Sequence, residues 1–435
     1  MEKINSHELV SKLKFCVFDL ETTGGNQKHD KIIEVGLVQI ENLKITKKLN
    51  FLINPEMNIP EFIQKLTHIS NKDVQDQPII DDKVDEILEF MGDRILVAHN
   101  TSFDVPFFNS VLTRLNRPTL ENKSLCTNLM TKYLLPNILN SNLTYMSKVF
   151  GIKLDKAHRA LADAEAAAKL LLNYLNIFIY KNITKINHLY YPRNRYELDR
   201  IHYKKEHHTS EEILEFLDKN TYNALITLKG NNGVILFSFP IKDGKTNKFI
   251  TDKILKTTWK TVTIKVFGHL LESVINFNQF FNKFSQDEKT DILNNFNDLS
   301  FDKKTHQKEY FNENSELIDF VIIPHLIPEQ FIICCNNITN NKNHLIFRFP
   351  AHKKRLVQFI SNRSVKGQKI KQKNNSMHPK YKQMINRVIS AGVNNQTLFA
   401  FSKETLNENS DLLLKQLQEF TLKNQQTECY PQKYI

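Results

Sequence analysis

An apolar run that ends in two spaced acids constrains this chain more than any other feature. Residues Phe15 to Leu20 read as a buried strand, and Asp19 and Glu21 lie two positions apart at its end. Because side chains alternate along a strand, both carboxylates point to the same face. Acids this close repel each other unless a cation neutralises them, and Mg²⁺ or Mn²⁺ prefers such oxygen ligands. The alternative is a solvated strand end that carries two acids by chance.

Two later segments carry further acids in defined settings. Residues 95–99 read as a buried strand that leads through a loop to a helix opening near Asp104. The run from His158 to Ala168 is rich in Ala, Leu and Glu, which predicts a helix. His158 precedes its first turn, where the side chain can move, whereas Asp163 lies inside the helix and is held rigidly. We therefore expect the acids of all three segments to meet at one point.

Together these segments resemble the motifs of the DEDDh family of 3′→5′ exonucleases, in a form similar to the proofreading epsilon subunits of bacterial DNA polymerase III. The match includes a histidine five positions before the last aspartate, and it covers about residues 13–178. The matching motifs are Asp19-Leu20-Glu21-Thr22-Thr23-Gly24, His99-Asn100-Thr101-Ser102-Phe103-Asp104 and His158-Arg159-Ala160-Leu161-Ala162-Asp163, and Ile33-Glu34-Val35-Gly36 is similar to the family's second strand.

The resemblance implies hydrolysis of a terminal phosphodiester with two divalent cations, Mg²⁺ or Mn²⁺. Asp19, Glu21 and Asp163 would hold the cation that binds the attacking water. Asp19 would bridge to the second cation, which Asp104 would support. His158 would accept the proton of the water, since imidazole titrates near neutral pH.

The resemblance also implies which residues contact the terminal nucleotide. His68 stands where relatives usually carry a glycine, in the segment from Leu66 to Ser70. By family position, the nucleotide-binding residues would be Leu20, Thr22, Thr67, His68, Asn100 and Phe103.

A length of 435 residues allows two or three domains. We expect an α/β ribonuclease-H-like exonuclease domain over residues 1–180, with a mixed sheet flanked by helices. A polar, basic linker would follow over 181–208, and an α+β region of unknown fold would occupy 209–435. That region could divide again into 209–310 and 311–435. The predicted strands of the first domain are 14–20, 32–40, 45–53 and 95–99, and its predicted helices are 81–91, 104–116, 142–150 and 158–177.

The positive charge is concentrated in the C-terminal part. Residues 1–180 hold 21 basic and 22 acidic residues, whereas the remainder holds 38 and 25. The stretch from Lys353 to Lys382 contains ten basic residues and no acid, with Phe359 and Tyr381 interleaved, so it could bind phosphates. A solvated loop, or a coding bias toward lysine, is the alternative. The candidate nucleic-acid contacts are Lys366, Lys369, Lys371 and Lys373.

Three classes of function fit these observations. The leading one is a DNA 3′→5′ exonuclease of proofreading or repair that acts on single-stranded 3′ ends and releases nucleoside monophosphates. The alternatives are an RNA-trimming exonuclease of the same fold and an inactive, polymerase-associated binding module. No polymerase motif is visible, so proofreading would need a DNA polymerase subunit as partner. The five cysteines lack metal-ligand spacing, and no apolar run has the length of a membrane span, which favours the cytoplasm and no membrane partner.

Overall fold

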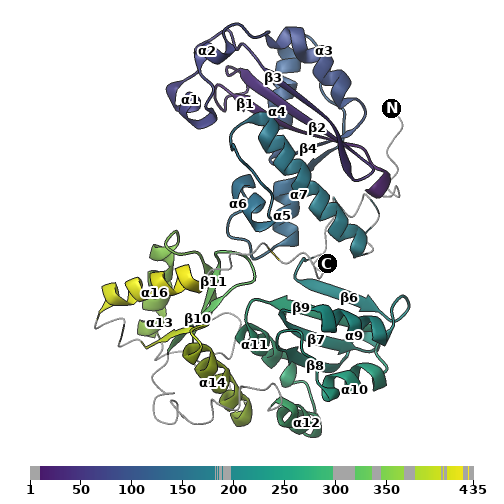
Figure 1. The fold of residues 1–435 in the computed structure, drawn as a ribbon, viewed down its shortest axis with the longest axis vertical. Coiled ribbons are helices and arrows are strands. Elements are labelled where there is room, and N and C mark those ends of the chain that lie inside the picture. The colour runs from purple at the N-terminus through teal and green to yellow at the C-terminus, as the bar shows by residue number, and fades with distance from the viewer. Residues whose placement is uncertain are drawn as a thin grey trace. The chain divides into compact units, whose positions relative to one another are not determined.

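The chain forms two compact units, Met1–Leu198 and Asp199–Tyr434 (Figure 1). This computed structural model describes residues 10–181, 183, 185, 189, 197–296, 319–335, 344–366, 378–402, 405, 409–424 and 430.

The first unit is built on a mixed five-stranded sheet in the order β3-β2-β1-β4-β5. Neighbouring strands are antiparallel on the β3-β2-β1 side and parallel on the β1-β4-β5 side. This arrangement confirms the predicted fold class. The strands are β1 (Phe15–Thr22), β2 (Ile32–Glu41), β3 (Lys44–Leu52), β4 (Ile95–Ala98) and β5 (Ser124–Cys126).

Helices cover both faces of this sheet. Phe18 of β1 shares a buried core with Ile87 of α3 and Phe107 of α4, which lie on one face. The other face meets the first turn of α7, where Gly36 of β2 approaches Ala160. The unit contains a short 3₁₀ helix at Val10–Lys12 and helices α1 (Glu61–Thr67), α2 (Asn71–Val74), α3 (Ile80–Met91), α4 (Thr101–Arg114), α5 (Thr127–Leu134), α6 (Leu143–Val149) and α7 (Ala160–Tyr180).

The contact between β2 and α7 requires a glycine. A Cβ atom placed on Gly36 would lie 2.3 Å from the backbone carbon of Ala160 and from the backbone nitrogen of Leu161. Gly36 is also the direct neighbour of Asp19 in the β1–β2 pairing. The missing side chain at Gly36 therefore lets the start of α7 approach the strand pair that carries Asp19.

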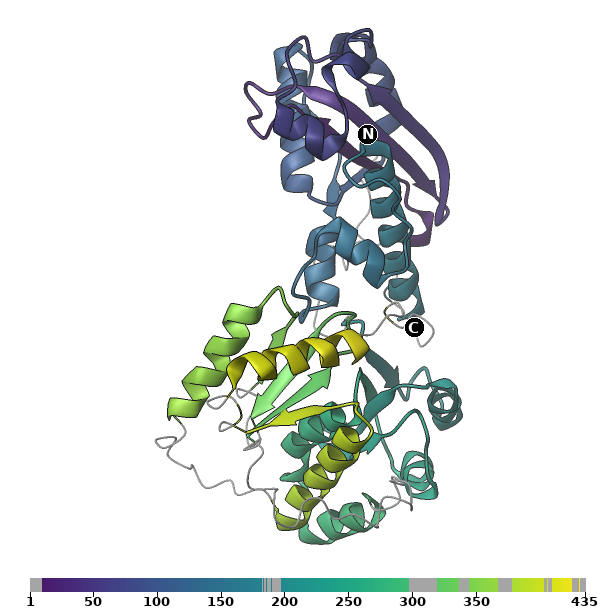
Figure 2. The ribbon, with the colours of Figure 1, turned by 60° about the vertical axis from the view of Figure 1, so that its left-hand side comes forward.

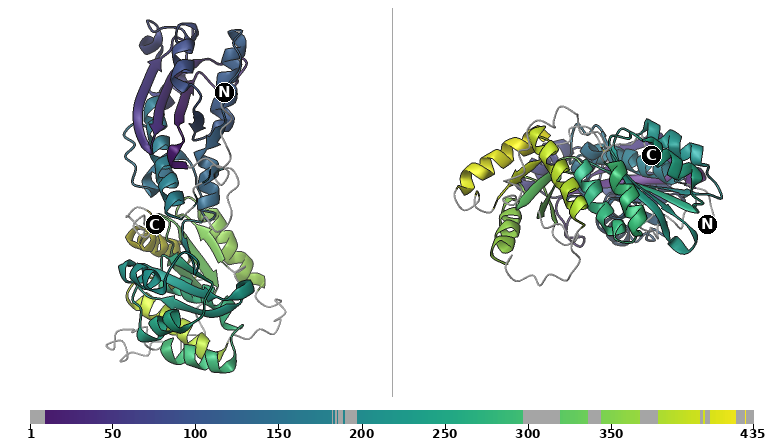
Figure 3. Two further views of the ribbon diagram at one scale, coloured as in Figure 1. Left: turned by 90° about the vertical axis from the view of Figure 1, so that its right-hand side faces the viewer. Right: turned by 90° about the horizontal axis from the view of Figure 1, so that it is seen from below.

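The second unit begins with a four-stranded antiparallel sheet in the order β6-β9-β7-β8. Helices α9 and α10 lie side by side in this part of the chain (Figures 1 and 3). The elements are β6 (Arg200–Lys204), α9 (Ser210–Lys219), β7 (Asn223–Lys229), a 3₁₀ turn (Asn231–Gly233), β8 (Ile235–Ile241), α10 (Lys248–Lys256), β9 (Thr261–Phe267), α11 (Leu270–Phe281) and α12 (Gln286–Phe296).

A second antiparallel sheet follows in the order β12-β11-β10-β13. Helices α13 and α16 pack on the face of this sheet that contributes Phe320, Phe331 and Phe347 to a common core (Figure 2). The strands β11 and β12 pair antiparallel, with Phe331 opposite Phe347. The elements are β10 (Phe320–Pro324), β11 (Phe331–Cys335), β12 (His344–Phe347), α13 (Lys353–Lys366), α14 (Pro379–Asn394), β13 (Phe399–Phe401) and α16 (Ser410–Asn424).

The segment predicted as a linker over 181–208 is partly structured. The backbone N–H of buried Leu198 donates to the carbonyl of Leu134 at 2.9 Å, so this end belongs to the first unit. Residues Arg200–Lys204 form β6 and pair with β9. This strand forms within a basic sequence because Ile201 and Tyr203 bury an alternating apolar face. The predicted domain limits, including the linker, stay predictions. Across the described residues, no helix has the length and apolar character needed to cross a membrane.

Candidate active site

Asp19 and Glu21 lie on the face of β1 that the start of α7 covers. Their positions alternate with Phe18 and Leu20, which point into the core on the opposite side. Asp19 pairs with Gly36 and Glu21 pairs with Glu34 across the β1–β2 ladder. Both acids are half-buried.

Asp104 reaches the same end of the sheet from the first turn of α4. Its carboxyl group is buried, with 4 % of the residue exposed, and it has the backbone N–H of Leu20 beside it. The parallel pairing of β1 and β4 brings these segments together, because both strands end at the same edge of the sheet.

His158 and Asp163 come from the start of α7. The backbone N–H of His158 donates to Oδ2 of Asp163 at 3.1 Å. His158 has a positive φ of 61°, a left-handed conformation that is uncommon outside glycine. Ligand-type side-chain atoms of Glu21, His158 and Asp163 lie within 4.8 Å of one another. The imidazole is exposed, so solvent and substrate can reach it.

The acids of this site hold protons unusually tightly. Desolvation raises the pKa of Asp19 well above its usual range, and the charges of Asp104 and Asp163 raise it further. Desolvation and the charge of Asp163 raise the pKa of Glu21 to about 8. Desolvation also raises the pKa of Asp104 to about 7 and that of Asp163 to about 6. The site is therefore a concentration of negative charge that a cation would relieve.

The donor set fits a divalent cation. Oδ1 of Asp163 is buried and has no hydrogen-bond partner, although such atoms are nearly always paired in folded proteins. It lies among carboxylate oxygens and one imidazole, which are ligands that Mg²⁺ and Mn²⁺ accept. Asp19 and Asp104 lie outside the group of three within 4.8 Å, but their charges act on the same carboxyls.

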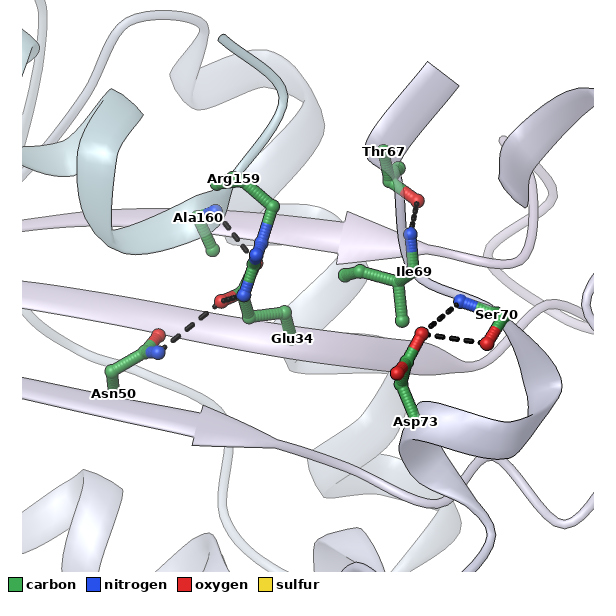
Figure 4. A network of polar contacts seen from close by, with 8 residues as sticks. All are labelled: Glu34, Asn50, Thr67, Ile69, Ser70, Asp73, Arg159 and Ala160. Carbon is green, nitrogen blue, oxygen red and sulfur yellow. Dashed lines mark hydrogen bonds and ion pairs between the residues drawn. The ribbon is translucent and has the colours of Figure 1, made fainter. Parts of the chain in front are cut away.

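A buried ion pair behind the acids was not predicted from the sequence. Arg159 donates from Nε and from a terminal guanidinium nitrogen to the carboxylate of Glu34, at 3.0 and 2.9 Å (Figure 4). The same carboxylate accepts the backbone N–H of Ala160 at 2.9 Å and the amide of Asn50 at 3.2 Å. The side chain of Glu34 is only 1 % exposed. The sequence does contain one sign of it, because Glu34 lies between the apolar residues Ile33 and Val35.

Several candidate nucleotide contacts use their polar atoms inside the protein. The Thr22 hydroxyl donates to the Gly24 carbonyl at 2.7 Å. The Thr67 hydroxyl donates to the Ile63 carbonyl at 2.9 Å and accepts the Ile69 N–H at 3.2 Å, the latter drawn in Figure 4. Both threonines, like Leu20, are buried.

The other candidate contacts are more accessible. His68 is exposed and has a φ of 56°, a left-handed conformation that glycine adopts more easily than other residues. Asn100 is exposed, and its side-chain oxygen accepts the Ser102 hydroxyl at 2.8 Å. Phe103 is half-buried and contacts the ring of Phe107 at 5.5 Å. Nucleotide binding by all six residues stays a prediction.

The predicted phosphate-binding stretch is only partly described. Residues 353–366 form α13, whose Leu356 and Phe359 belong to a buried core. Tyr381 of α14 is fully buried against Phe281, so neither aromatic residue of this stretch can stack on a base. Lys366 ends α13, and Lys369, Lys371 and Lys373 lie outside the described residues.

Comparisons with known proteins identify relatives of the first unit. Residues 16–171 match the exonuclease family of the RNase_T type. The chain is 34 % identical over 167 residues to DNA polymerase III subunit epsilon of Aquifex aeolicus, covering 39 % of this chain and 83 % of that protein. It is 39 % identical over 168 residues to the PolC-type DNA polymerase III of Clostridium perfringens, covering 39 % of this chain and 12 % of that protein.

The chain thus spans about an eighth of the length of the PolC-type polymerases that it matches. Among solved structures, it is similar to exonuclease X in complex with a 5′-overhanging duplex DNA. That match has 26 % identity and a TM-score of 0.32, and it covers 37 % of this chain and 91 % of the other.

Proposed function

This chain belongs, through residues 16–171, to the DEDDh family of 3′→5′ exonucleases, and we propose that its substrate is the single-stranded 3′ end of DNA. The observation that carries the proposal is the meeting of Glu21, His158 and Asp163 within 4.8 Å, beside two more acids with raised pKa values. The preference for DNA is supported by the names of the two polymerase III relatives.

Asp19, Glu21, Asp104 and Asp163 would hold divalent cations. When bound, such cations would lower the pKa of a water molecule and neutralise charge on the scissile phosphate. One ring nitrogen of His158 would accept a proton from that water. The water oxygen bonds to the terminal phosphorus, and the bond to the preceding nucleotide's 3′ oxygen breaks. A nucleoside 5′-monophosphate leaves, and the freed 3′ oxygen takes a proton from solvent water to become the 3′ hydroxyl of the shortened strand.

The remaining finer assignments are also proposals. The accessible side chains of His68 and Asn100 are the better candidates to contact the terminal nucleotide, because the hydroxyls of Thr22 and Thr67 are already bonded within the protein. A DNA polymerase is the proposed partner, and the cytoplasm is the proposed location.

The experiment uses the purified chain with Mg²⁺ or Mn²⁺ on 5′-labelled single-stranded DNA, mismatched duplex and RNA of the same sequence. We expect stepwise shortening of the DNA from its 3′ end, and no cleavage in EDTA. Asp163→Asn should lower the rate by more than the roughly 10- to 100-fold typical of residues that only support a metal ligand. Faster degradation of the RNA would overturn the assignment to DNA.

Glu165→Gln is the matched control for Asp163→Asn. Glu165 lies two residues further along α7 and pairs with Lys48 at 2.9 Å, away from the group of three. It should keep the wild-type rate, since surface ion pairs contribute little. Equal hydrolysis rates for Asp163→Asn and Glu165→Gln would show that Asp163 does not take part in catalysis.

A further inference from the structure

The first sheet of the second unit has two chemically different faces. Opposite positions in the ladder place Ile201, Ile264, Ile226 and Phe239 on one face. The alternate positions place His202, Thr263, Thr227 and Ser238 on the other face, together with the buried apolar side chains of Leu225 and Phe267. Hydrogen bonds between His202 and Thr263 at 3.2 Å and between Thr227 and Ser238 at 3.0 Å confirm that these pairs share a side.

All four neighbouring helices pack on the apolar face. Phe216 of α9 contacts the ring of Tyr203, whose strand position lies on that face. The rings of Phe249 in α10, Phe277 in α11 and Phe296 in α12 each contact Phe239, at 5.5, 6.5 and 4.7 Å. The core formed with these four helices therefore lies on the apolar face and not on the polar face.

Every Lys and Arg of the four strands lies on the polar face. The strands β6, β7, β8 and β9 contain no aspartate or glutamate. In the ladder, Arg200 is opposite Lys265, and Lys204 and Lys229 are both opposite Thr261. We call the set Arg200, His202, Lys204, Lys229, Thr263 and Lys265 the basic face.

The basic face is open at the end that carries Lys204. His202 and Lys204 are exposed, and Lys229 is half-buried. At the opposite end, Asp199 partly neutralises the charges, because its carboxylate lies 3.5 Å from Lys265 and 3.8 Å from Arg200. Among the described residues, Lys204 and Lys229 form no ion pair with a carboxylate, so their charges remain available to a ligand.

Antiparallel sheets commonly expose one face to solvent, but such a face usually carries charges of both signs. The helices on the apolar side do mix them: α9 carries Glu211, Glu215 and Lys219, and α10 carries Asp252 and Lys253. A coding bias toward lysine would not remove acids from the strands alone. The strands' own charges are all positive, and those at the Lys204 end, away from Asp199, point to a polyanionic ligand.

We propose that the basic face binds the phosphodiester backbone of a single-stranded nucleic acid, as a second contact region separate from the exonuclease site. Lys204 and Lys229 are separated by one strand, which corresponds to about 10 Å, and Arg200 and Lys204 by about 13 Å along β6. That area accommodates more than one phosphate. The face exposes no aromatic ring for base stacking, so binding depends on salt and not on base sequence. The proposal rests on the proposed nuclease function, because that function supplies the strand.

The test compares Lys204→Gln/Lys229→Gln with the matched control Lys219→Gln/Lys248→Gln in the full chain. The control lysines are exposed on α9 and α10, which cover the other face, and both variants lose the same charge. Binding of a fluorescein-labelled oligothymidylate is followed by anisotropy in EDTA between 50 and 300 mM KCl. Two lost phosphate contacts should lower the slope of log K against log salt by about 1.4 and weaken binding about tenfold at 100 mM salt.

Hydrolysis of a dinucleotide with Mg²⁺ separates this proposal from the proposed function. A dinucleotide is short, so both variants should hydrolyse it at the wild-type rate if only strand binding is lost. Superimposable salt titrations for the two variants would overturn the proposal that the basic face binds nucleic acid. Failure of the wild-type chain to hydrolyse any nucleic acid would overturn the nuclease proposal instead, and the anisotropy comparison would still decide the binding surface.

Discussion

Four carboxyl groups with raised pKa values meet at the end of β1. Each group binds its proton more tightly in the folded than in the unfolded chain, where an aspartate titrates near 4. Their favourable contribution is fully present below the unfolded pKa and is lost as the pH rises through the folded values, which run from about 6 for Asp163 to about 8 for Glu21. Without metal, the folded state should therefore become less stable between pH 4 and pH 8.

We predict that Asp19→Asn stabilises the protein in EDTA, because it removes one of the repelling charges. The gain in melting temperature should be near zero at pH 4 and should grow toward pH 8, by about 2 to 4 °C for each kcal/mol of repulsion relieved. With Mg²⁺ at pH 8 the order should reverse, since only the wild-type site binds the cation fully. Thermal melts at the two pH values, with and without metal, make the comparison. A constant difference across pH would contradict it.

Helix α7 completes the candidate active site, because its start places His158 and Asp163 beside the acids of β1. Gly36 allows its first turn to approach β2, and Glu34 holds that turn through Arg159 and the N–H of Ala160. A carboxylate beside the first N–H groups of a helix is also favoured by the helix dipole. The position of Asp163 and His158 thus depends on a strand residue that does not itself belong to the group of three.

We predict that Glu34→Gln lowers turnover by about ten- to a hundredfold and weakens Mg²⁺ binding, as loss of a supporting partner typically does. Stability should fall by about 1 to 3 kcal/mol, because buried polar partners lose their acceptor. The readouts are kcat as a function of Mg²⁺ concentration and the melting temperature.

Glu41→Gln provides the control for Glu34→Gln. Glu41 ends the same strand and also binds an arginine, Arg94, at 2.6 Å, but far along β2 from Asp19. It should keep the wild-type Mg²⁺ dependence. If both variants lose activity only in proportion to their stability, Glu34 does not position α7.

The elements that the sequence predicts well are those with a long regular pattern. The strands β1 and β2 and helix α7 combine long apolar or Ala-rich runs with acids at defined offsets, so both fold and candidate site follow from them. The strand Ser124–Cys126 has only three residues, too few to display a period. The strand Arg200–Lys204 and helix Lys353–Lys366 were hidden because dense positive charge masks their buried residues. Glu34 required a tertiary partner, Arg159, that lies 125 positions away in the chain.

At the scale of the whole molecule, the boundary between the two units lies near residue 198. Leu198 is fully buried, and its N–H donates to Leu134. Lys181 donates to the carbonyl of Glu197 at 2.6 Å. We therefore predict that a chain truncated to residues 1–198 is more stable than one truncated to 1–180. Burying one leucine contributes about 1.5 to 3 kcal/mol, which corresponds to a melting temperature higher by about 3 to 12 °C. Equal melting temperatures would place the boundary earlier.

The same truncation tests what the charge distribution means. Residues 1–180 are nearly neutral, and the excess of basic residues lies beyond them. The 1–198 chain should hydrolyse a dinucleotide as fast as the full chain, because every acid of the site and His158 belongs to it. Its binding to a long single strand should be weaker and less dependent on salt, since each lost phosphate contact removes about 0.7 from the slope. Identical slopes for the truncated and full chains would mean that the lysines of the second unit reflect coding bias and that this unit binds something other than nucleic acid.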